Sequence, residues 1–376
     1  MDSKEFLDAL NLVAKEKGID FAVVAPDDPL VLGMVDALNA IGIPCFGPDK
    51  KAAILEGSKV FSKNLMKKYG IPTAAYEVFD DMEKALAYLE TAPLPTVVKA
   101  DGLALGKGVI IAETKEQAQD AVRSMMADKV FGASGDHVVI EEFMTGPEVS
   151  VLAFTDGKTM VPMVSAMDHK RALDGDKGLN TGGMGTIAPN PFYTEAVAKE
   201  CMEKIFVPTM EAMNKEGRTF KGCLFFGLMI TPAGPKVIEY NCRFGDPETQ
   251  VVLPLLESDL LTIMQAVAAE KLADVEVKFS DKAACCVIMA SAGYPQSYEK
   301  GFPITLPEKD QLIFVAGAKA ADGKLLTNGG RVLGVTEIAD TLPEAIAKSY
   351  EAVKTVKFDN AFYRNDIGKK ALAAEV

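Results

Sequence analysis

The clearest candidate for chemistry in the sequence is a short polar run, 239–243, at the end of an apolar segment. Glu239 and Asn241 are two positions apart, and on a β-strand residues at that spacing project from the same face. A carboxylate and an amide oxygen on one face suit Mg²⁺ held together with nucleotide phosphates. Arg243 follows at the strand end, where sites of α/β proteins tend to lie. The pattern predicts a metal–nucleotide site, with a plain strand ending in solvated polar residues as the alternative.

A Gly-rich segment at 100–108 is the second candidate. The apolar runs 96–99 and 109–112 on either side of it predict a hairpin. Glycines let backbone N–H groups approach phosphates, and Lys99 and Lys107 can supply charge. The glycine spacing is not that of a Walker A motif, and no helix follows. The segment alone leaves a phosphate-binding loop and an ordinary hairpin equally open.

Further charged residues flank the predicted elements. Lys59 and Lys63 lie at i and i+4, on one face of a predicted helix. Glu141 and Glu148 at strand edges could accept hydrogen bonds from an adenine amino group or ribose hydroxyls, although each strand taken alone favours simple solvation. His169 is one of two histidines, which leaves few candidates for histidine acid–base chemistry.

Helical and strand-like segments alternate along the first part of the chain, which favours βαβ units, and the pattern changes after residue 282 to a mixed type. The segment 237–240 predicts the buried strand that carries Glu239. The expected helices are 1–20, 31–41, 52–69, 81–90, 115–126, 194–214, 259–270 and 342–356. The other expected strands are 21–25, 45–46, 71–79, 96–99, 109–112, 138–143, 148–154, 223–230, 284–290, 313–318, 325–327 and 332–336.

Composition narrows the function classes. The chain has 376 residues, enough for two to four domains. Its net charge of −13 argues against sequence-independent binding of nucleic acid. No apolar run of 18 or more residues predicts a membrane span. The six cysteines include no C-x-x-C pair, and the adjacent Cys285 and Cys286 are expected to be buried strand residues in a reducing, cytoplasmic protein.

Taken together, these motifs resemble the ATP-grasp superfamily and, within it, the phosphoribosylamine–glycine ligase family. The resemblance runs from about residue 20 to the C-terminus. It is carried by the motif segments 55–59, 98–104, 106–108, 140–143, 168–170, 180–185, 238–248 and 328–332. The strings Lys-Ala-Asp-Gly at 99–102 and Asn-Cys-Arg-Phe-Gly-Asp-Pro-Glu at 241–248 are highly specific in combination.

The resemblance implies a multidomain chain of α/β and α+β type. Residues 1–57 are expected to be a partial N-terminal parallel βαβ domain, 58–280 an ATP-grasp domain with a flap subdomain at about 81–146, and 281–376 a small mixed domain. The family opens with a strand and a Gly-rich loop that this sequence does not show, so somewhat more than one βαβ unit is expected to be missing. The family's Gly-Pro-Glu is replaced by Ala-Pro-Asp-Asp at 25–28.

The activity that the resemblance implies is the joining of glycine to 5-phosphoribosylamine with ATP and Mg²⁺ or Mn²⁺, through glycyl phosphate, in a monomer without nucleic-acid or membrane partners. The alternatives are another ATP-grasp carboxylate–amine ligase and a truncated, silent ATP-binding chain. A dinucleotide-dependent oxidoreductase is disfavoured because no strand is followed by Gly-x-Gly-x-x-Gly.

The resemblance also assigns roles to single residues. Glu239 and Asn241 would hold the metal, and the catalytic region would contain Asp168, Lys170 and Arg243. The expected nucleotide-binding residues are Lys63, Lys99, Gly106, Lys107, Gly108, Glu141, Glu142, Phe143 and Glu148. The expected substrate-binding residues are Asn180, Thr181, Gly182, Gly183, Asn328, Gly329, Gly330 and Arg331.

Overall fold

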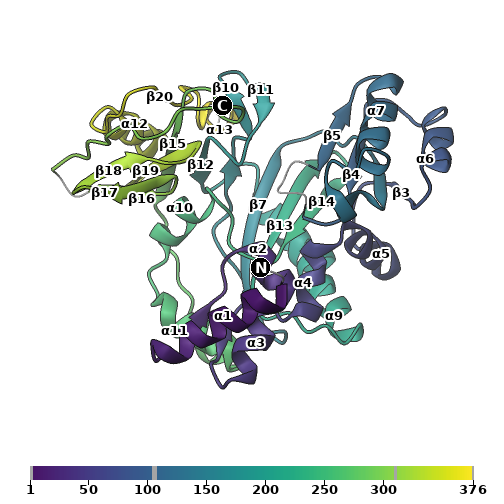
Figure 1. The fold of residues 1–376 in the computed structure, drawn as a ribbon, viewed down its shortest axis with the longest axis horizontal. Coiled ribbons are helices and arrows are strands. Elements are labelled where there is room, and N and C mark those ends of the chain that lie inside the picture. Colours follow the sequence, from purple (N-terminus) through teal and green to yellow (C-terminus); the bar gives the residue numbers. More distant parts are fainter. Residues whose placement is uncertain (1–2, 104–107, 309–310, 375–376) are drawn as a thin grey trace.

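Three antiparallel sheets and one short parallel strand pair form the main framework of the computed structural model, which describes residues 3–103, 108–308 and 311–374 (Figure 1). The tips of the Gly-rich hairpin, including Gly106 and Lys107, lie outside the described residues. None of the described helices combines the length and the apolar character needed to cross a membrane.

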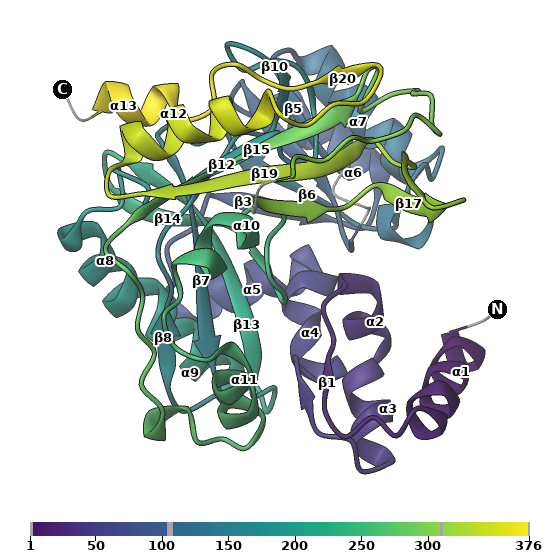
Figure 2. The same ribbon diagram turned by 90° about the vertical axis from the view of Figure 1, so that its left-hand side faces the viewer.

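The N-terminal segment is more broken than the sequence predicts. The expected helix 31–41 is wrong in its start and continuity, because Gly33 (φ 101°) ends one helix and begins the next. The expected buried strand 21–25 is reduced to a two-residue pairing, and Val23 is 45% exposed. The elements are α1 (Ser3–Glu16), β1 (Ala22–Val23), α2 (Asp27–Leu32), α3 (Met34–Ala40) and β2 (Cys45–Phe46), and Figure 2 shows them together at one side of the molecule.

The parallel pair β1–β2 is a separate two-stranded sheet, outside the larger sheets of the described residues. Each strand has two residues, and the pairing joins Ala22 to Cys45 and Val23 to Phe46. Because so short a two-stranded pair is marginally stable in water, it should open before the larger sheets do. We expect hydrogen exchange at the Val24 amide to be much faster than at the Phe226 amide in the core sheet. Equal protection of the two amides, measured by mass spectrometry or NMR at pH 7, would contradict this order of opening.

The predicted helix 52–69 is two helices, α4 (Lys50–Gly57) and α5 (Lys59–Tyr69). Ser58 has extended backbone angles (φ −141°, ψ 114°), so the chain leaves α4 and starts a new helix at once. The Ser58 hydroxyl then accepts a hydrogen bond from Phe61 N and caps α5. This break turns the end of α4 and the start of α5 towards the same region of the molecule.

The flap region contains one antiparallel sheet with the strand order β3-β6-β4-β5, and its predicted hairpin of β4 and β5 is confirmed. Helices α6 and α7 pack on it through a small apolar cluster that includes Ala85, Val98 and Val122. The elements are β3 (Tyr76–Phe79), α6 (Met82–Leu89), β4 (Thr96–Ala100), β5 (Val109–Ala112), α7 (Lys115–Met126), a 3-10 turn (Gly132–Gly135) and β6 (Val138–Glu142).

The second sheet lies at the centre of the molecule, with the strand order β14-β13-β7-β8 (Figure 1). Its strands are β7 (Glu148–Thr155), β8 (Met160–Pro162), β13 (Gly222–Thr231) and β14 (Gly234–Asn241). The predicted helix 194–214 is confirmed as α8 (Glu195–Cys201), a π-helical turn (Met202–Phe206) and α9 (Val207–Lys215). The Phe206 and Phe226 rings, 4.2 Å apart between centroids, join this helical segment to the sheet.

The third sheet combines strands from two distant parts of the sequence. Its order is β16-β19-β15-β12-β9, with β20 beside β15, so strands from 167–188 pair with strands from 283–339. Its strands are β9 (Met167–Asp168), β12 (Gly185–Ala188), β15 (Ala283–Ser291), β16 (Leu312–Val315), β19 (Arg331–Ala339) and β20 (Ala361–Phe362). Cys285 and Cys286 are buried on β15, as predicted.

Smaller elements complete the fold around these sheets. Helix α12 (Leu342–Val353) packs on β15 and β19. The ribbons are β10 (Arg171–Leu173) with β11 (Lys177–Asn180) and β17 (Ala318–Ala321) with β18 (Lys324–Thr327). The remaining helices are α10 (Thr249–Val252), a 3-10 turn (Leu253–Leu255), α11 (Leu260–Ala268), a 3-10 turn (Leu272–Asp274) and α13 (Lys369–Ala374).

Candidate active site

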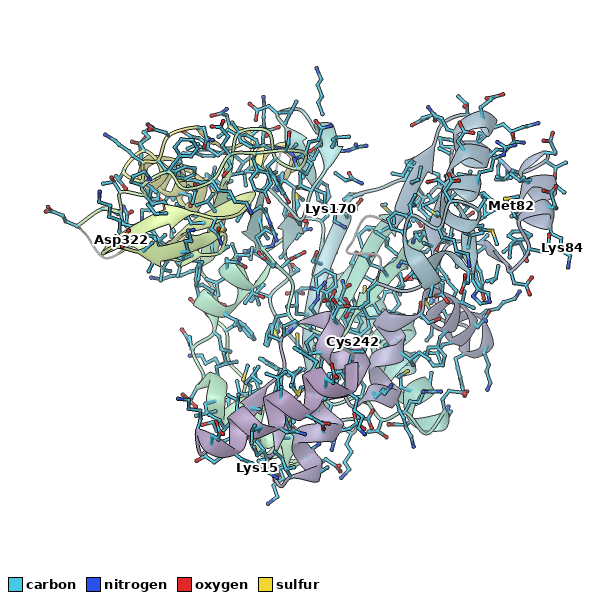
Figure 3. The ribbon with its side chains drawn as sticks, in the orientation of Figure 1. Lys15, Met82, Lys84, Lys170, Cys242 and Asp322 are labelled. Carbon is cyan, nitrogen blue, oxygen red and sulfur yellow. The ribbon has the colours of Figure 1, made fainter. Side chains whose placement is uncertain are left out.

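A cavity of about 970 Å³ is lined by residues of the flap sheet, the central sheet and the third sheet. Lys170, which lines this cavity, is labelled in the central part of the molecule in Figure 3, as is Cys242, which follows the lining residue Asn241. Most of the predicted site residues that the structure describes line this cavity, although they come from distant parts of the chain. They are Lys63, Lys99, Gly108, Glu141, Glu142, Phe143, Glu148, Asp168, Lys170, Asn180, Thr181, Gly182, Glu239, Asn241 and Arg243.

A β-bulge on β14 decides which side chains of that strand reach the cavity. Val237 pairs with Leu228 and Glu239 pairs with Gly227, so Ile238 is an extra residue without a partner on β13. The prediction that Ile238 is buried with Val237 is wrong, since Ile238 is half-buried and lines the cavity. Glu239 and Asn241 both line the cavity, as the same-face spacing predicts.

Glu239 is an anion surrounded by cations. Burial alone would raise its pKa, but the charges of Lys170, Lys99, Lys59 and Arg243 outweigh burial and lower the pKa of this carboxyl. The nearest of the ion pairs places Lys170 Nζ 3.8 Å from Glu239 Oε1. Glu239 is therefore ionised at neutral pH, which is the form that binds a divalent cation.

Two lysines share one buried carboxylate at the flap end of the cavity. Glu141 Oε2 lies 3.1 Å from Lys63 Nζ and 3.0 Å from Lys99 Nζ. Glu141 is only 3% exposed, so its predicted solvation is wrong. Burial lowers the pKa of Lys63 to about 8 against the opposing charge of Glu141. Glu141 Oε1 is buried and has no hydrogen-bond partner among the residues that the structure describes, so this end of the cavity presents an acceptor.

The neighbouring residues of the predicted nucleotide region are more open. Glu142 is held by Lys236 at 2.9 Å, and Phe143 is 38% exposed. Glu148 lies on the cavity wall with Lys170 Nζ 3.7 Å from its carboxylate. An exposed aromatic ring beside exposed carboxylates leaves an apolar surface and acceptors available to one ligand.

Lys170 stands among carboxylates at the other side of the cavity. The charge of Glu148 contributes most to raising the pKa of Lys170. Glu239, Asp168 and Glu248 add to this effect, whereas burial opposes it. Burial, with the adjacent charge of Glu248, raises the pKa of Asp168 well above its usual range. The Asp168 carboxylate is oriented by His169 N, which donates to Oδ1 at 2.7 Å.

The predicted substrate loop and the Asn328–Arg331 segment meet, but in a different way from the sequence prediction. Arg331 does not line the cavity, and its guanidinium donates to Gly182 O at 2.9 Å and pairs with Asp246 at 2.8 Å. Gly183, Asn328, Gly329 and Gly330 are also absent from the cavity wall. Arg331 therefore holds the loop that carries Asn180, Thr181 and Gly182 to the wall.

Sequence reasoning gave no site role to three charged cavity residues, although it placed Lys59 on one helix face with Lys63. Glu248 is buried and accepts a hydrogen bond from Ser150 Oγ at 3.0 Å. Glu56, at the end of α4, is buried beside Arg243, and burial raises its pKa to about 7. Lys59 donates to Gly102 O at the base of the hairpin. Glu56 and Glu248 lie inside the motif segments 55–59 and 238–248, and this position is the sequence feature that indicates a role in the site.

His169 is structural, not an acid–base group. It is buried, its Nδ1 lies 3.0 Å from Gly185 O, and its Nε2 accepts from Gly368 N at 3.1 Å. A ring with both nitrogens engaged in this way is neutral, and burial lowers the pKa of His169 to about 4. Arg364 adds to this lowering, whereas Asp176 and Asp366 oppose it.

This neutral histidine predicts a specific loss of stability in acid. Between about pH 6.5 and pH 4 the unfolded chain binds a proton at residue 169 that the folded chain excludes, so the free energy of unfolding falls as pH falls. The total for this group is roughly 3 kcal/mol. Urea unfolding between pH 8 and pH 5 should show a smaller pH dependence in His169→Gln than in the parent. The exposed His137 provides the control, because His137→Gln should keep the parent's slope; identical slopes in all three chains would refute the assignment.

The two opposed sheets with buried lysines between them define the class: this is the ATP-grasp fold. A biotin carboxylase domain of the 2-oxoglutarate carboxylase from Hydrogenobacter thermophilus shares it, with a TM-score of 0.75 at 16% identity, over 95% of this chain and 78% of that one. At this identity the likeness concerns the fold alone.

The particular family follows from closer relatives. Models of the N, ATP-grasp (A) and C domains of phosphoribosylglycinamide synthetase match residues 1–56, 57–249 and 284–370. A phosphoribosylamine–glycine ligase of Halalkalibacterium halodurans is 48% identical over 374 residues, 99% of this chain and 87% of that protein. The crystal structure of phosphoribosylamine–glycine ligase from Thermotoga maritima matches with a TM-score of 0.80 at 40% identity, over 86% of this chain and 81% of that one.

The chain therefore belongs to the phosphoribosylglycinamide synthetase family. The predicted family, the multidomain ATP-grasp fold and the class of ATP-dependent ligase are confirmed. Among the described residues no three His, Cys, Asp or Glu side chains gather as a ready-made metal site. The oxygen donors Glu239 and Asn241 fit a Mg²⁺ ion that takes its other ligands from phosphates and water.

Proposed function

We propose that this chain catalyses the ligation of glycine to 5-phosphoribosylamine in purine biosynthesis, with ATP converted to ADP and phosphate. The observation that carries the proposal is the cluster of cations in a single cavity, four of which act on the ionised carboxylate of Glu239. Lys59, Lys63, Lys99, Lys170 and Arg243 all line it together with Glu239. Such a site neutralises phosphate charge and orients reactants, which is what phosphoryl transfer requires of a protein.

The reaction has two balanced steps. A glycine carboxylate oxygen attacks the γ-phosphorus of ATP, which gives glycyl phosphate and releases ADP. The amine of 5-phosphoribosylamine then attacks the acyl carbon, loses a proton and expels inorganic phosphate, leaving glycinamide ribonucleotide. Neither step needs a nucleophile from the protein. In agreement with this, both ring nitrogens of His169 are engaged in hydrogen bonds within the fold, so this side chain has no free nitrogen for catalysis.

The residues divide this work by position. Lys63 and Lys99, together with Gly108 and the Gly-rich flap that includes Gly106 and Lys107, hold the nucleotide phosphates. Glu239 and Asn241 would hold Mg²⁺ or Mn²⁺. The bound metal would stabilise the negative charge on the phosphate oxygens. Arg243, Asp168 and Lys170 stabilise the charge that develops on the transferred groups. The adenosine is held by Glu141, Glu142, Phe143 and Glu148.

The proposal extends to the acceptor side and to the organisation of the chain. The loop with Asn180, Thr181, Gly182 and Gly183, which Arg331 braces, holds the substrates together with the segment Asn328, Gly329 and Gly330. Residues 1–57, 58–280 and 281–376 act as N-terminal, ATP-grasp and C-terminal units. The enzyme works as a cytoplasmic monomer, a setting that suits six unpaired, buried cysteines.

The test is product formation. The purified chain is incubated with MgATP, isotopically labelled glycine and freshly generated 5-phosphoribosylamine, and ADP and glycinamide ribonucleotide are followed by mass spectrometry. We expect continued ADP release to require both glycine and 5-phosphoribosylamine. One ADP should form for each glycinamide ribonucleotide. Parallel reactions with alanine, β-alanine or bicarbonate in place of glycine test other ligase activities. ADP release that is independent of glycine, or a ligation product formed from another acid in place of glycine, would overturn the proposal.

A further inference from the structure

We propose that Glu56 is a positioning residue for the ligation, acting through Arg243. It lies near the end of helix α4, just before the turn into α5, which carries Lys59 and Lys63. The inference rests on the proposed function, because it assumes that Arg243 contacts the transferred groups. It concerns a residue to which neither the sequence patterns nor the family assignment gave a role.

The carboxylate of Glu56 makes two contacts with the chain immediately after Asn241. Its Oε2 accepts a hydrogen bond from Cys242 N at 2.7 Å. Its Oε1 lies 3.3 Å from Arg243 Nη2. One carboxylate thus holds both the backbone at the exit of β14 and the guanidinium that follows it.

The two side chains differ in burial, and Arg243 has few other anionic partners among the described residues. Glu56 is 8% exposed, whereas the Arg243 side chain is 26% exposed and lines the cavity. The only other anion paired with Arg243 is Asp27, at 4.0 Å, among the described residues. Arg243 Nη1 donates to Phe244 O at 3.0 Å, so one edge of the guanidinium is fixed by Phe244 and Glu56.

The described residues supply no hydrogen-bond acceptor for the rest of the Arg243 guanidinium. A planar guanidinium fixed along one edge presents its remaining N–H groups in a defined direction. Arg243 lines the cavity, where phosphate or carboxylate oxygens are the complementary partners for these N–H groups. Glu56 therefore aligns the donors of Arg243 before substrates arrive.

Replacing Glu56 by Gln separates the two contacts. The amide oxygen can still accept from Cys242 N, but the charge that holds Arg243 is gone. We expect kcat to fall about 10- to 100-fold, since small errors in the placement of a charged group are costly in transition-state stabilisation. The dissociation constant of MgATP should change by less than about threefold, and the midpoint of thermal unfolding by only a few degrees. Glu216→Gln, at a surface ion pair with Lys68, is the matched control and should keep the parent's kcat.

A double-mutant cycle distinguishes positioning from general support of the fold. In an Arg243→Met background, Glu56→Gln should cause little further loss of kcat, because the group that Glu56 orients is absent. Equal factors in the two backgrounds would overturn the proposal, as would a parent-like kcat in Glu56→Gln. If Glu56→Gln does not fold, Glu56→Asp takes its place in the cycle and is judged by the same criteria. If Arg243→Met itself keeps full glycine-dependent activity, Arg243 and this inference both fail while the ligase function stands.

Discussion

Replacing Glu239 by Gln is expected to lower Mg²⁺-dependent turnover by about 100-fold or more. Glu239 is the one carboxylate of the proposed metal pair, and neutralising it leaves two amide oxygens, which are weak ligands for Mg²⁺. The metal supplies several kcal/mol of charge stabilisation, and each 1.36 kcal/mol is worth about tenfold in rate. Glu239→Gln keeps the size of the side chain, so packing at the exit of β14 should be preserved.

The same substitution should leave metal-free ATP binding unchanged or slightly tighter. Lys170, Lys99 and Lys59 all interact with the Glu239 charge, and its removal makes the cavity more positive. Turnover against free Mg²⁺ concentration and titration calorimetry of ATP in excess chelator measure the two effects separately. Glu257→Gln, at a surface pair with Lys278, controls for the loss of one negative charge. Parent-like turnover at limiting Mg²⁺ would remove Glu239 from the metal site.

Replacing Lys99 by Met is expected to weaken MgATP binding by roughly 10- to 150-fold. The Lys99 ammonium is buried, lies 3.0 Å from Glu141 and 3.2 Å from Ile238 O, and belongs to the strand that leads into the Gly-rich hairpin. The loss of a charge-assisted hydrogen bond to a phosphate costs about 1.5–3 kcal/mol, which is the source of this range. Met has a similar length and fills the volume of the lysine stem.

Lys99→Met also breaks part of a buried ion network, so stability has to be measured beside affinity. Removing one partner of a buried pair costs about 3–5 kcal/mol in general, but Lys63 remains paired with Glu141 at 3.1 Å and should limit the loss. Calorimetric titration with MgATP, well below the unfolding midpoint of the variant, gives the affinity. Lys115→Met, at an exposed pair with Glu90 in the same flap region, is the control. The same affinity in Lys99→Met and parent would exclude Lys99 from the nucleotide site.

The elements that sequence patterns predict best are those with strong local signals. Helix α7 has the predicted bounds, because Thr114 and Gln117 form a capping box at its start. The hairpin of β4 and β5 follows from two apolar runs around glycines. The breaks at Gly33 and Ser58 differ from the predicted continuous helices, because the flanking residues continue a helical pattern, whereas the left-handed Gly33 and the N-capping Ser58 interrupt it.

The predicted site likewise depends on local sequence patterns and on contacts between distant segments. The same-face spacing of Glu239 and Asn241 is a local property of a strand, so it could be predicted. The half-burial of Ile238 could not, because the bulge exists only in relation to the partner strand β13. The burial of Glu141 likewise depends on Lys63 and Lys99, which come from other elements and were separately noted as cations.

By itself, the sequence indicated the class of chemistry. The same-face spacing of Glu239 and Asn241 predicts a divalent cation held with nucleotide phosphates, and the resemblance to the family implies an activated carboxylate. The tertiary structure alone decided the partners of each charged group. It joined strands from 167–188 with β15 and β19 in one sheet, turned Arg331 towards Asp246, and placed Glu56 against Arg243. The physical reason is that burial and ion pairing depend on contacts between distant segments, and such contacts leave no periodic signal along the chain.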